Sequence, residues 1–178
     1  MKISKLILCS IILELIMAGC QKTSTTMPAD FSFVYQWNTG SLPPQYHYSY
    51  EIKVYPAGQG QFTYQHGYSG EDALPEWQTS FTVKISQLDD LFRLIKEKDL
   101  FRSQWAEGEL SIGGSSSDLD IISAGKEHRL PNDAAMITTD RQSVQEVFEQ
   151  IKALVPQSIW DEMQTRQEQY ENQISSNK

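Results

Sequence analysis

Three histidines are the residues whose type most directly suggests a metal or acid–base site, provided that they converge. A hairpin register that keeps apolar residues together would place His66 beside Tyr50 and turn His47 to the opposite side of the sheet. His128 lies in a separate segment of charged residues. The spacing therefore predicts no shared metal site, and no residue pattern indicates a cofactor.

A serine-rich segment, Gly113–Asp118, contains the residue types of a nucleophile loop. The G-x-S-x-G pattern that exposes a catalytic serine is absent from it. The sequence also lacks a P-loop and a dinucleotide fingerprint. We interpret the segment as a turn between strands.

Four carboxylates, Glu107, Glu109, Asp118 and Asp120, could supply the acid and the base of a glycosidase. Such enzymes hold two carboxyl groups roughly 5 to 9.5 Å apart, a separation that sequence spacing does not determine. A cell-envelope hydrolase that uses these loop carboxylates therefore remains an alternative. Because no catalytic motif is present, we predict that the protein is not an enzyme and has no catalytic residues.

Composition and charge restrict the class of protein. The chain has 178 residues, a mass of 20.3 kDa, 39% hydrophobic and 21% charged residues, and a net charge of −8. This length suits one domain, and the composition suits a globular fold with a core. The negative charge argues against a nucleic-acid partner.

The first twenty residues have the organisation of an export signal. Lys2 and Lys5 precede an apolar run, 6–16, that is too short to span a membrane but has the length of a signal-peptide core. The run ends in Ile16-Met17-Ala18-Gly19-Cys20, which resembles the lipobox of bacterial lipoproteins. The resemblance implies cleavage before Cys20 and attachment of lipid, such as palmitate, to its thiol. It also implies localisation in the cell envelope, and Gln21 would favour the outer membrane in a bacterium with two membranes.

Two other interpretations of this segment stay open: an ordinary secretory signal cut near Ala18 or Gly19, and a buried N-terminal helix. If cleavage removes residues 1–19, two lysines and one glutamate are lost, and the net charge changes from −8 to −9. Cys9 is lost as well, which leaves Cys20 as the remaining cysteine. Residues 20–30 are polar up to the first strand and are predicted to form a tether.

Hydrophobic periodicity divides the rest of the chain into strands and helices. Period-two alternation predicts strands near 31–37, 46–54, 62–66, 77–85, 118–124 and 127–130. A 3.6-residue period predicts helices from 86 to 98, over 144–154 and from 158 onward. We therefore predict one α+β domain, 31–171, with an antiparallel sheet of about six strands and two to three amphipathic helices packed on one face. Residues 172–178 are predicted to form a frayed polar tail.

The element order over residues 46–155 resembles uncharacterised domains of secreted bacterial proteins and lipoproteins. The stretches VKISQLDDLFRLIKEKDLF and SAGKEHRLP carry this resemblance. It implies the order hairpin, strand, helix, short hairpin and helix, and it implies no activity.

Aromatic residues are concentrated in the first strands, and some of them could form a binding surface. The candidates are Trp37, Tyr46, Tyr55 and Tyr68. We expect a lipid-anchored, non-enzymatic binding or accessory module with an envelope protein or a glycan as its partner. A periplasmic inhibitor or immunity-type protein is a further alternative.

Overall fold

A six-stranded antiparallel sheet forms the centre of the protein in the computed structural model, which describes residues 26–68, 76–106, 108–109 and 113–176. Its strands are β1 (Ser32–Asn38), β2 (Tyr48–Val54), β3 (Gln59–His66), β4 (Trp77–Thr82), β5 (Ser116–Ser123) and β6 (Lys126–Arg129). They lie in the order β4-β3-β2-β1-β5-β6, and each neighbouring pair is antiparallel. The helices are α2 (Ile85–Glu97), α3 (Thr138–Ala153) and α4 (Gln157–Ser176), with 3₁₀ turns at Pro56–Gly58 and Asp133–Ala135. The predicted α+β class is confirmed.

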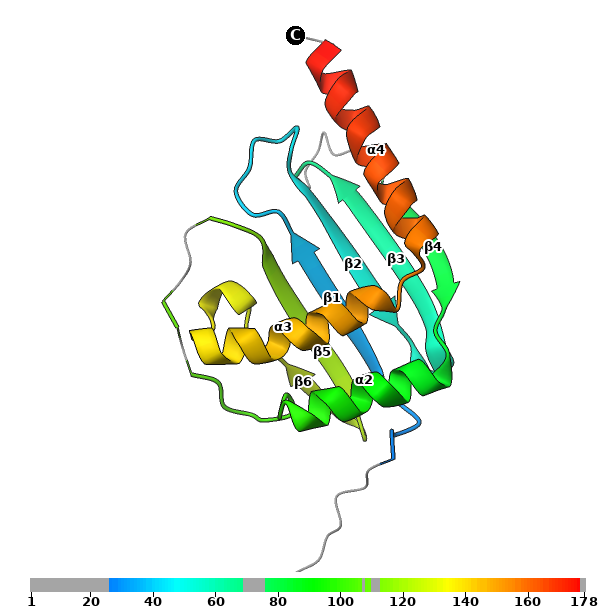
Figure 1. Cartoon of the computed structure of the whole chain (residues 1–178), viewed down its shortest axis with the longest axis vertical. Helices are drawn as coiled ribbons and strands as arrows, with labels where there is room; N and C mark the ends of the chain where they lie inside the picture. The colour runs from blue at the N-terminus through cyan, green and yellow to red at the C-terminus, as the bar shows by residue number, and fades with distance from the viewer. Residues whose placement is uncertain (1–25, 69–75, 107, 110–112, 177–178) are drawn as a thin grey trace, which may run out of the picture.

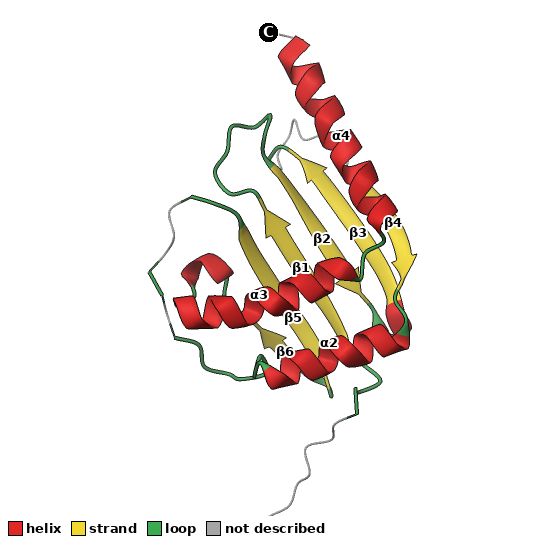
Figure 2. Cartoon of the chain, viewed as in Figure 1, coloured by secondary structure: helices red, strands yellow, loops and turns green. Residues whose placement is uncertain are grey.

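All three helices cover the same face of the sheet (Figures 1 and 2). The helices α2 and α3 cross the strands, while α4 runs along β3 and β4 and extends beyond the end of the sheet. The buried stripes are Leu88, Leu91, Phe92 and Ile95 on α2, and Val144, Val147, Phe148 and Ile151 on α3. These stripes bury apolar area against the strands, which is the main favourable term in folding.

Alternation along the strands supplies the other half of this core. Side chains that face the helices are buried, among them Phe33, Tyr35, Tyr50, Ile52, Val54, Phe62, Tyr64, Leu119 and Ile121. Trp160 of α4 packs edge-on against Tyr50 and Phe62, with ring centroids 5.1 Å apart in both pairs.

The helix α4 continues to Ser176 and so includes residues 172–176, which the sequence assigned to a polar tail.

The β2–β3 hairpin has a different register from the one expected. His66 pairs with Tyr48, and Tyr50 pairs with Tyr64, so the predicted pairing of His66 with Tyr50 is wrong. The reason is a tight turn, in which the Tyr55 amide donates to the Gln59 carbonyl at 2.8 Å. The displacement is two residues, which preserves the face on which every side chain lies.

The chain joins the sheet at the end opposite the free end of α4 (Figure 1). Met27 packs against the core, and the Asp30 carboxylate accepts hydrogen bonds from the amides of Ala124 and Gly125 at 2.9 and 2.6 Å. The Gly125 bond is the main cause that lowers the pKa of Asp30. Residues 27–30 therefore belong to the folded domain, although the sequence placed them in the tether.

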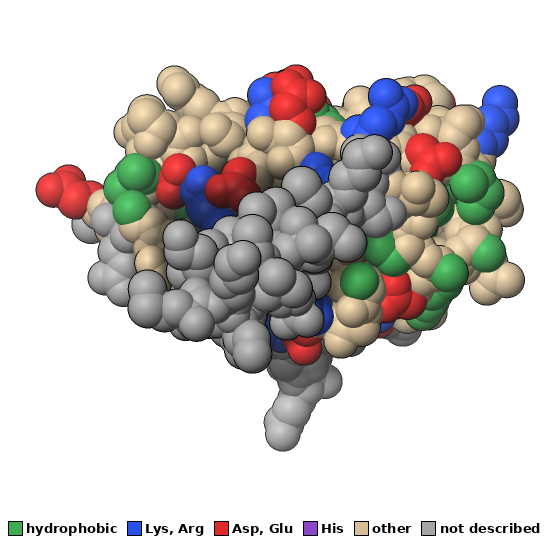
Figure 3. All heavy atoms as spheres, turned by 90° about the horizontal axis from the view of Figure 1, so that it is seen from below, with side chains coloured by type: hydrophobic (Ala, Val, Ile, Leu, Met, Phe, Trp, Pro, Cys, Tyr) green, Lys and Arg blue, Asp and Glu red, His purple; other side chains and the backbone are tan. Residues whose placement is uncertain are grey.

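The predicted signal peptide, 1–19, and the predicted lipidation site, Cys20, lie outside the described residues. Within the described part, no helix has the length and hydropathy needed to cross a membrane. Seen from the end where the chain joins the sheet, acidic and basic side chains lie beside one another (Figure 3).

Candidate functional site

The face of the sheet that the helices leave uncovered is the candidate functional site; we call it the open face. It arises directly from strand alternation, because the residues between the buried ones point to the other side. These positions carry amide, hydroxyl and charged groups on β1 to β5, including Gln36, Ser49, Glu51, Lys53, Gln61, Thr63, Gln65, Gln78 and Asp118. One side of an antiparallel sheet packed on a core and the other facing solvent is a common arrangement.

A hollow of about 400 Å³ lies on the open face and extends over β1, β2, β3 and β5 to the start of β4. The open-face residues of its lining are mainly polar: Gln36, Asn38, Ser49, Glu51, Lys53, Gln61, Thr63, Gln65, Glu76, Gln78 and Asp118. Trp37 and Tyr50, whose side chains lie on the covered side, also border it. Its volume falls within the range of small-ligand sites, which is roughly 300–1,000 Å³. The hollow can therefore accept a side chain or a small polar group.

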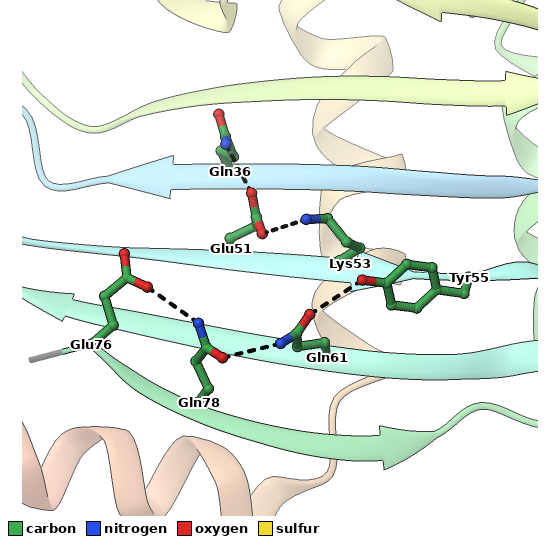
Figure 4. A network of polar contacts seen from close by, with 7 residues as sticks. All are labelled: Gln36, Glu51, Lys53, Tyr55, Gln61, Glu76 and Gln78. Carbon is green, nitrogen blue, oxygen red and sulfur yellow. Dashed lines mark hydrogen bonds and ion pairs between the residues drawn. The ribbon is translucent and has the colours of Figure 1, made fainter.

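A chain of hydrogen bonds runs across three strands of this face (Figure 4). The Tyr55 hydroxyl donates to the side-chain oxygen Oε1 of Gln61 at 3.3 Å, and the side-chain nitrogen Nε2 of Gln61 donates to Oε1 of Gln78 at 3.2 Å. The Gln78 amide in turn donates to the Glu76 carboxylate at 3.2 Å. All donors in the chain point toward Glu76, so the chain ends at a negative charge.

A second group of contacts links β1 and β2. Glu51 accepts a hydrogen bond from the Gln36 amide at 3.0 Å and pairs with Lys53 at 3.2 Å. A carboxylate has about four lone-pair sites, so these two contacts leave Glu51 with acceptor capacity.

The open face has an excess of negative charge. Among the described residues, its acidic groups are Glu51, Glu76, Asp118, Asp120 and Glu127, and its basic groups are Lys53, Arg129 and Lys84, which follows β4 in phase with Gln78; the net charge is −2. Around the hollow the balance is three carboxylates to one ammonium group. The field at this surface therefore attracts cations.

A smaller apolar area occupies the end of the open face near Asp30. It surrounds a second hollow of about 340 Å³ beside Val34, Tyr55 and Ile122. Tyr55 and Ile122 are 42% and 46% exposed. The open face thus combines an acidic polar area with a small apolar one.

The four aromatic residues predicted as a binding surface do not lie together. Trp37 stacks on Tyr50 at 5.1 Å and packs against the core, on the side that the helices cover. Tyr46 and Tyr68 are 49% and 46% exposed and belong to the loops at the far end of the sheet from Asp30. Only Tyr55 contributes its side chain to the open face.

The loop carboxylates of the hydrolase alternative are only partly described. Glu107 lies outside the described residues, and Glu109 is exposed. Asp118 accepts a hydrogen bond from the Asn132 amide at 2.9 Å, and Asp120 accepts two from Arg129 at 2.8 and 3.2 Å. Asp118 and Asp120 occupy alternate positions of β5 and so share the open face.

The histidines lie at three separate places. Nδ1 of His47 contacts the Gly67 carbonyl at 2.7 Å, and Nδ1 of His128 contacts the Phe101 carbonyl at 3.2 Å. Burial, and then the charge of Arg166, lowers the pKa of His66. Among the described residues, no three His, Cys, Asp or Glu side chains form a group that could hold a metal ion.

One buried polar network lies under α3, on the covered side of the sheet. The Tyr35 hydroxyl contacts the Ser117 hydroxyl at 3.1 Å, and the Ser117 amide donates to the Asp133 carboxylate at 2.8 Å. Burial raises the pKa of Tyr35 to about 12 and also raises the pKa of Asp133. We interpret these contacts as satisfying buried polar groups of the fold.

Sequence reasoning missed the glutamines of the open face, Gln36, Gln61 and Gln78. A sequence signal for them was present, because amide residues recur at the polar positions of successive predicted strands.

No protein-family model matches the chain, and no curated protein matches its sequence.

Proposed function

We propose that the protein is a lipid-anchored, non-enzymatic accessory module of the bacterial cell envelope that binds a cationic protein on its open face. The observation that carries this proposal is the acidic hollow on an uncovered sheet face. The lipobox resemblance at Cys20 supports the anchor and the envelope location. The net charge of the chain, −8, supports a partner of opposite sign.

The hollow suggests how such a partner would be held. A lysine or arginine side chain entering it would approach Glu51, Glu76 and Asp118, and Lys53 is the one basic side chain among the described residues of its lining. The carboxylates would accept charge-assisted hydrogen bonds, which are stronger than neutral ones. The exposed Tyr55 and Ile122 would contact apolar atoms at the rim.

The binding proposal is tested with a lysine octapeptide as the probe, titrated into the full chain and followed by NMR. The variant Glu51→Gln/Glu76→Gln/Asp118→Asn removes three charges from the hollow. The matched control, Glu97→Gln/Asp161→Asn/Glu168→Gln, removes three exposed charges from α2 and α4. We expect roughly tenfold weaker binding in the first variant, since three exposed ion pairs are lost at about 0.5 kcal/mol each, or about 1.5 kcal/mol together.

Because both variants have the same net charge, an equal loss of affinity would mean that the peptide senses only the overall charge, and the proposed site would be wrong. Crosslinking of the full-length protein in cells, followed by mass spectrometry, then identifies the natural partner. An inhibitor is a special case of this role, in which the captured partner is an enzyme that the protein inactivates.

The anchor is tested separately by Cys20→Ala, with Cys9→Ala as the control. We expect Cys20→Ala to release the protein from membranes and to abolish labelling with palmitate, while Cys9→Ala retains both. Membrane association and labelling of Cys20→Ala at the wild-type level would refute the anchor without affecting the binding proposal.

A further inference from the structure

The two edges of the sheet differ in how they are protected against pairing with another strand. The strand β6 is short, and Lys126, Glu127 and Arg129 place charges on three of its four residues. The other edge, β4, has six residues and contains no charged residue, proline or glycine. Natural sheets protect their edges with charges, prolines, bulges or short strands. The strand β4 has neither a charged residue nor a proline.

The backbone groups of β4 that point away from the sheet can be identified. The Val83 amide donates to the Gly58 carbonyl at 2.8 Å. Because hydrogen-bonded positions alternate along an antiparallel pair, the backbone N–H and C=O groups of Phe81 and Thr79 also point toward β3. The amides and carbonyls of Gln78, Ser80 and Thr82 therefore point outward. Within the described residues no other backbone group bonds to them, and their side chains are exposed.

We propose that this edge binds a second copy of the chain through antiparallel β4–β4 pairing centred on Ser80. In that register Ser80 faces Ser80 of the second copy, and Gln78 faces its Thr82. The outward amides and carbonyls of the two strands then bond to one another. Since every residue of β4 is uncharged, the pairing brings no like charges together within the strand.

Charge complementarity at the ends of β4 favours a second copy over an unrelated strand. The same register places Glu76 of one copy opposite Lys84 of the other, and the two-fold symmetry repeats this pair. Both residues are exposed, and they lie at alternate positions in phase with Ser80. A shift of two residues in either direction would separate Glu76 from Lys84, so the charges also select the register.

Pairing in this way would join the open faces of the two copies. Glu76 and Gln78 line the hollow and lie at the β4 edge, so the two hollows would become neighbours along one continuous sheet. The inference does not depend on what the hollow binds, because it rests on the edge and its flanking charges.

Cysteine crosslinking of the full-length protein in its cellular membrane tests the contact. Two Ser80→Cys copies would have Cα atoms about 5.5 Å apart, which is within the disulfide range. The matched control is Lys126→Cys on the β6 edge, and the wild type reports any crosslinking through Cys20. We expect rapid disulfide formation for Ser80→Cys alone, and equal rates for Ser80→Cys and Lys126→Cys would overturn the proposal.

Charge reversal tests the register, measured by sedimentation equilibrium of the full-length protein in detergent micelles. Glu76→Lys should weaken dimerisation by about tenfold, because two attractive pairs become repulsive, and Glu76→Lys/Lys84→Glu should restore it. Ser80→Pro should abolish dimerisation with an unchanged circular dichroism spectrum, because the amide that it removes does not bond to β3. A wild type that remains monomeric, or a double reversal that fails to restore association, would refute β4–β4 pairing.

Discussion

Replacement of Gly58 by alanine tests how closely the β2–β3 turn packs against Val83, the residue that follows the edge strand β4. Gly58 has φ = +86°, and a Cβ there would lie 2.3 Å from the Val83 carbonyl oxygen and 3.8 Å from Cδ1 of Leu88. Alanine in the left-handed region costs about 1–2 kcal/mol. Crowding that forces backbone to move costs about 1–3 kcal/mol more. We therefore expect Gly58→Ala to lower the free energy of unfolding by about 2–5 kcal/mol.

The steric part of this effect can be isolated with Gly125→Ala. Gly125 also has positive φ, +72°, but a Cβ there would meet no atom within 4 Å. Only the conformational cost of about 1–2 kcal/mol applies to it. Urea unfolding followed by tryptophan fluorescence measures both variants. Equal destabilisation, within about 0.5 kcal/mol, would refute the argument that Val83 leaves no room beside Gly58.

Three further predictions concern titratable groups. Lowering the pH below 6.5, the ordinary pKa of His66, should reduce stability, because the unfolded chain then binds a proton that the folded protein, with its lowered pKa, does not. Urea unfolding between pH 7.5 and 5.5 should show a weaker pH dependence in His66→Phe. Raising the pH above 10 should also reduce stability, because Tyr35 ionises near 10 when unfolded but at about 12 when folded. In Tyr35→Phe this alkaline loss should shrink, and at pH 7 the lost contact with Ser117 should cost about 1 kcal/mol in urea unfolding. Asp30→Ala should accelerate hydrogen exchange of the Ala124 and Gly125 amides, which lose their acceptor, whereas distant strand amides should exchange as before.

Local periodicity was sufficient to predict the fold class. The stripe Leu88, Leu91, Phe92 and Ile95 is buried as its 3.6-residue spacing predicts, because an amphipathic helix has one face to bury. The pairing of β1 with β5 could not be predicted in the same way. More than eighty residues separate the hydrogen-bonded Tyr35 and Ser117 side chains, and no local pattern encodes such a contact.

The candidate site was harder to predict than the fold, because it depends on which face of the sheet the helices cover. Trp37 and Tyr55 are both aromatic, yet the helices cover the side of the sheet on which Trp37 lies and leave that of Tyr55 open. Trp37 is separated from the buried Tyr35 by two positions and so lies on the same face, whereas Tyr55 directly follows the buried Val54 and lies on the opposite face. The residue type of an aromatic side chain does not reveal on which face it lies. The glutamines were overlooked for the related reason that a polar residue on a strand is ordinarily a solvated one.

The point at which the chain joins the sheet has a mechanical consequence. The N-terminal segment leads directly into β1, a central strand with β2 on one side and β5 on the other. A pulling force applied ahead of Met27 would act along β1 and would have to shear two rows of hydrogen bonds together, after first breaking the Asp30 contacts with the β5–β6 turn. A force applied before Met27 would therefore act on a strand that is hydrogen-bonded on both sides, whereas a force on the C-terminus would act first on α4.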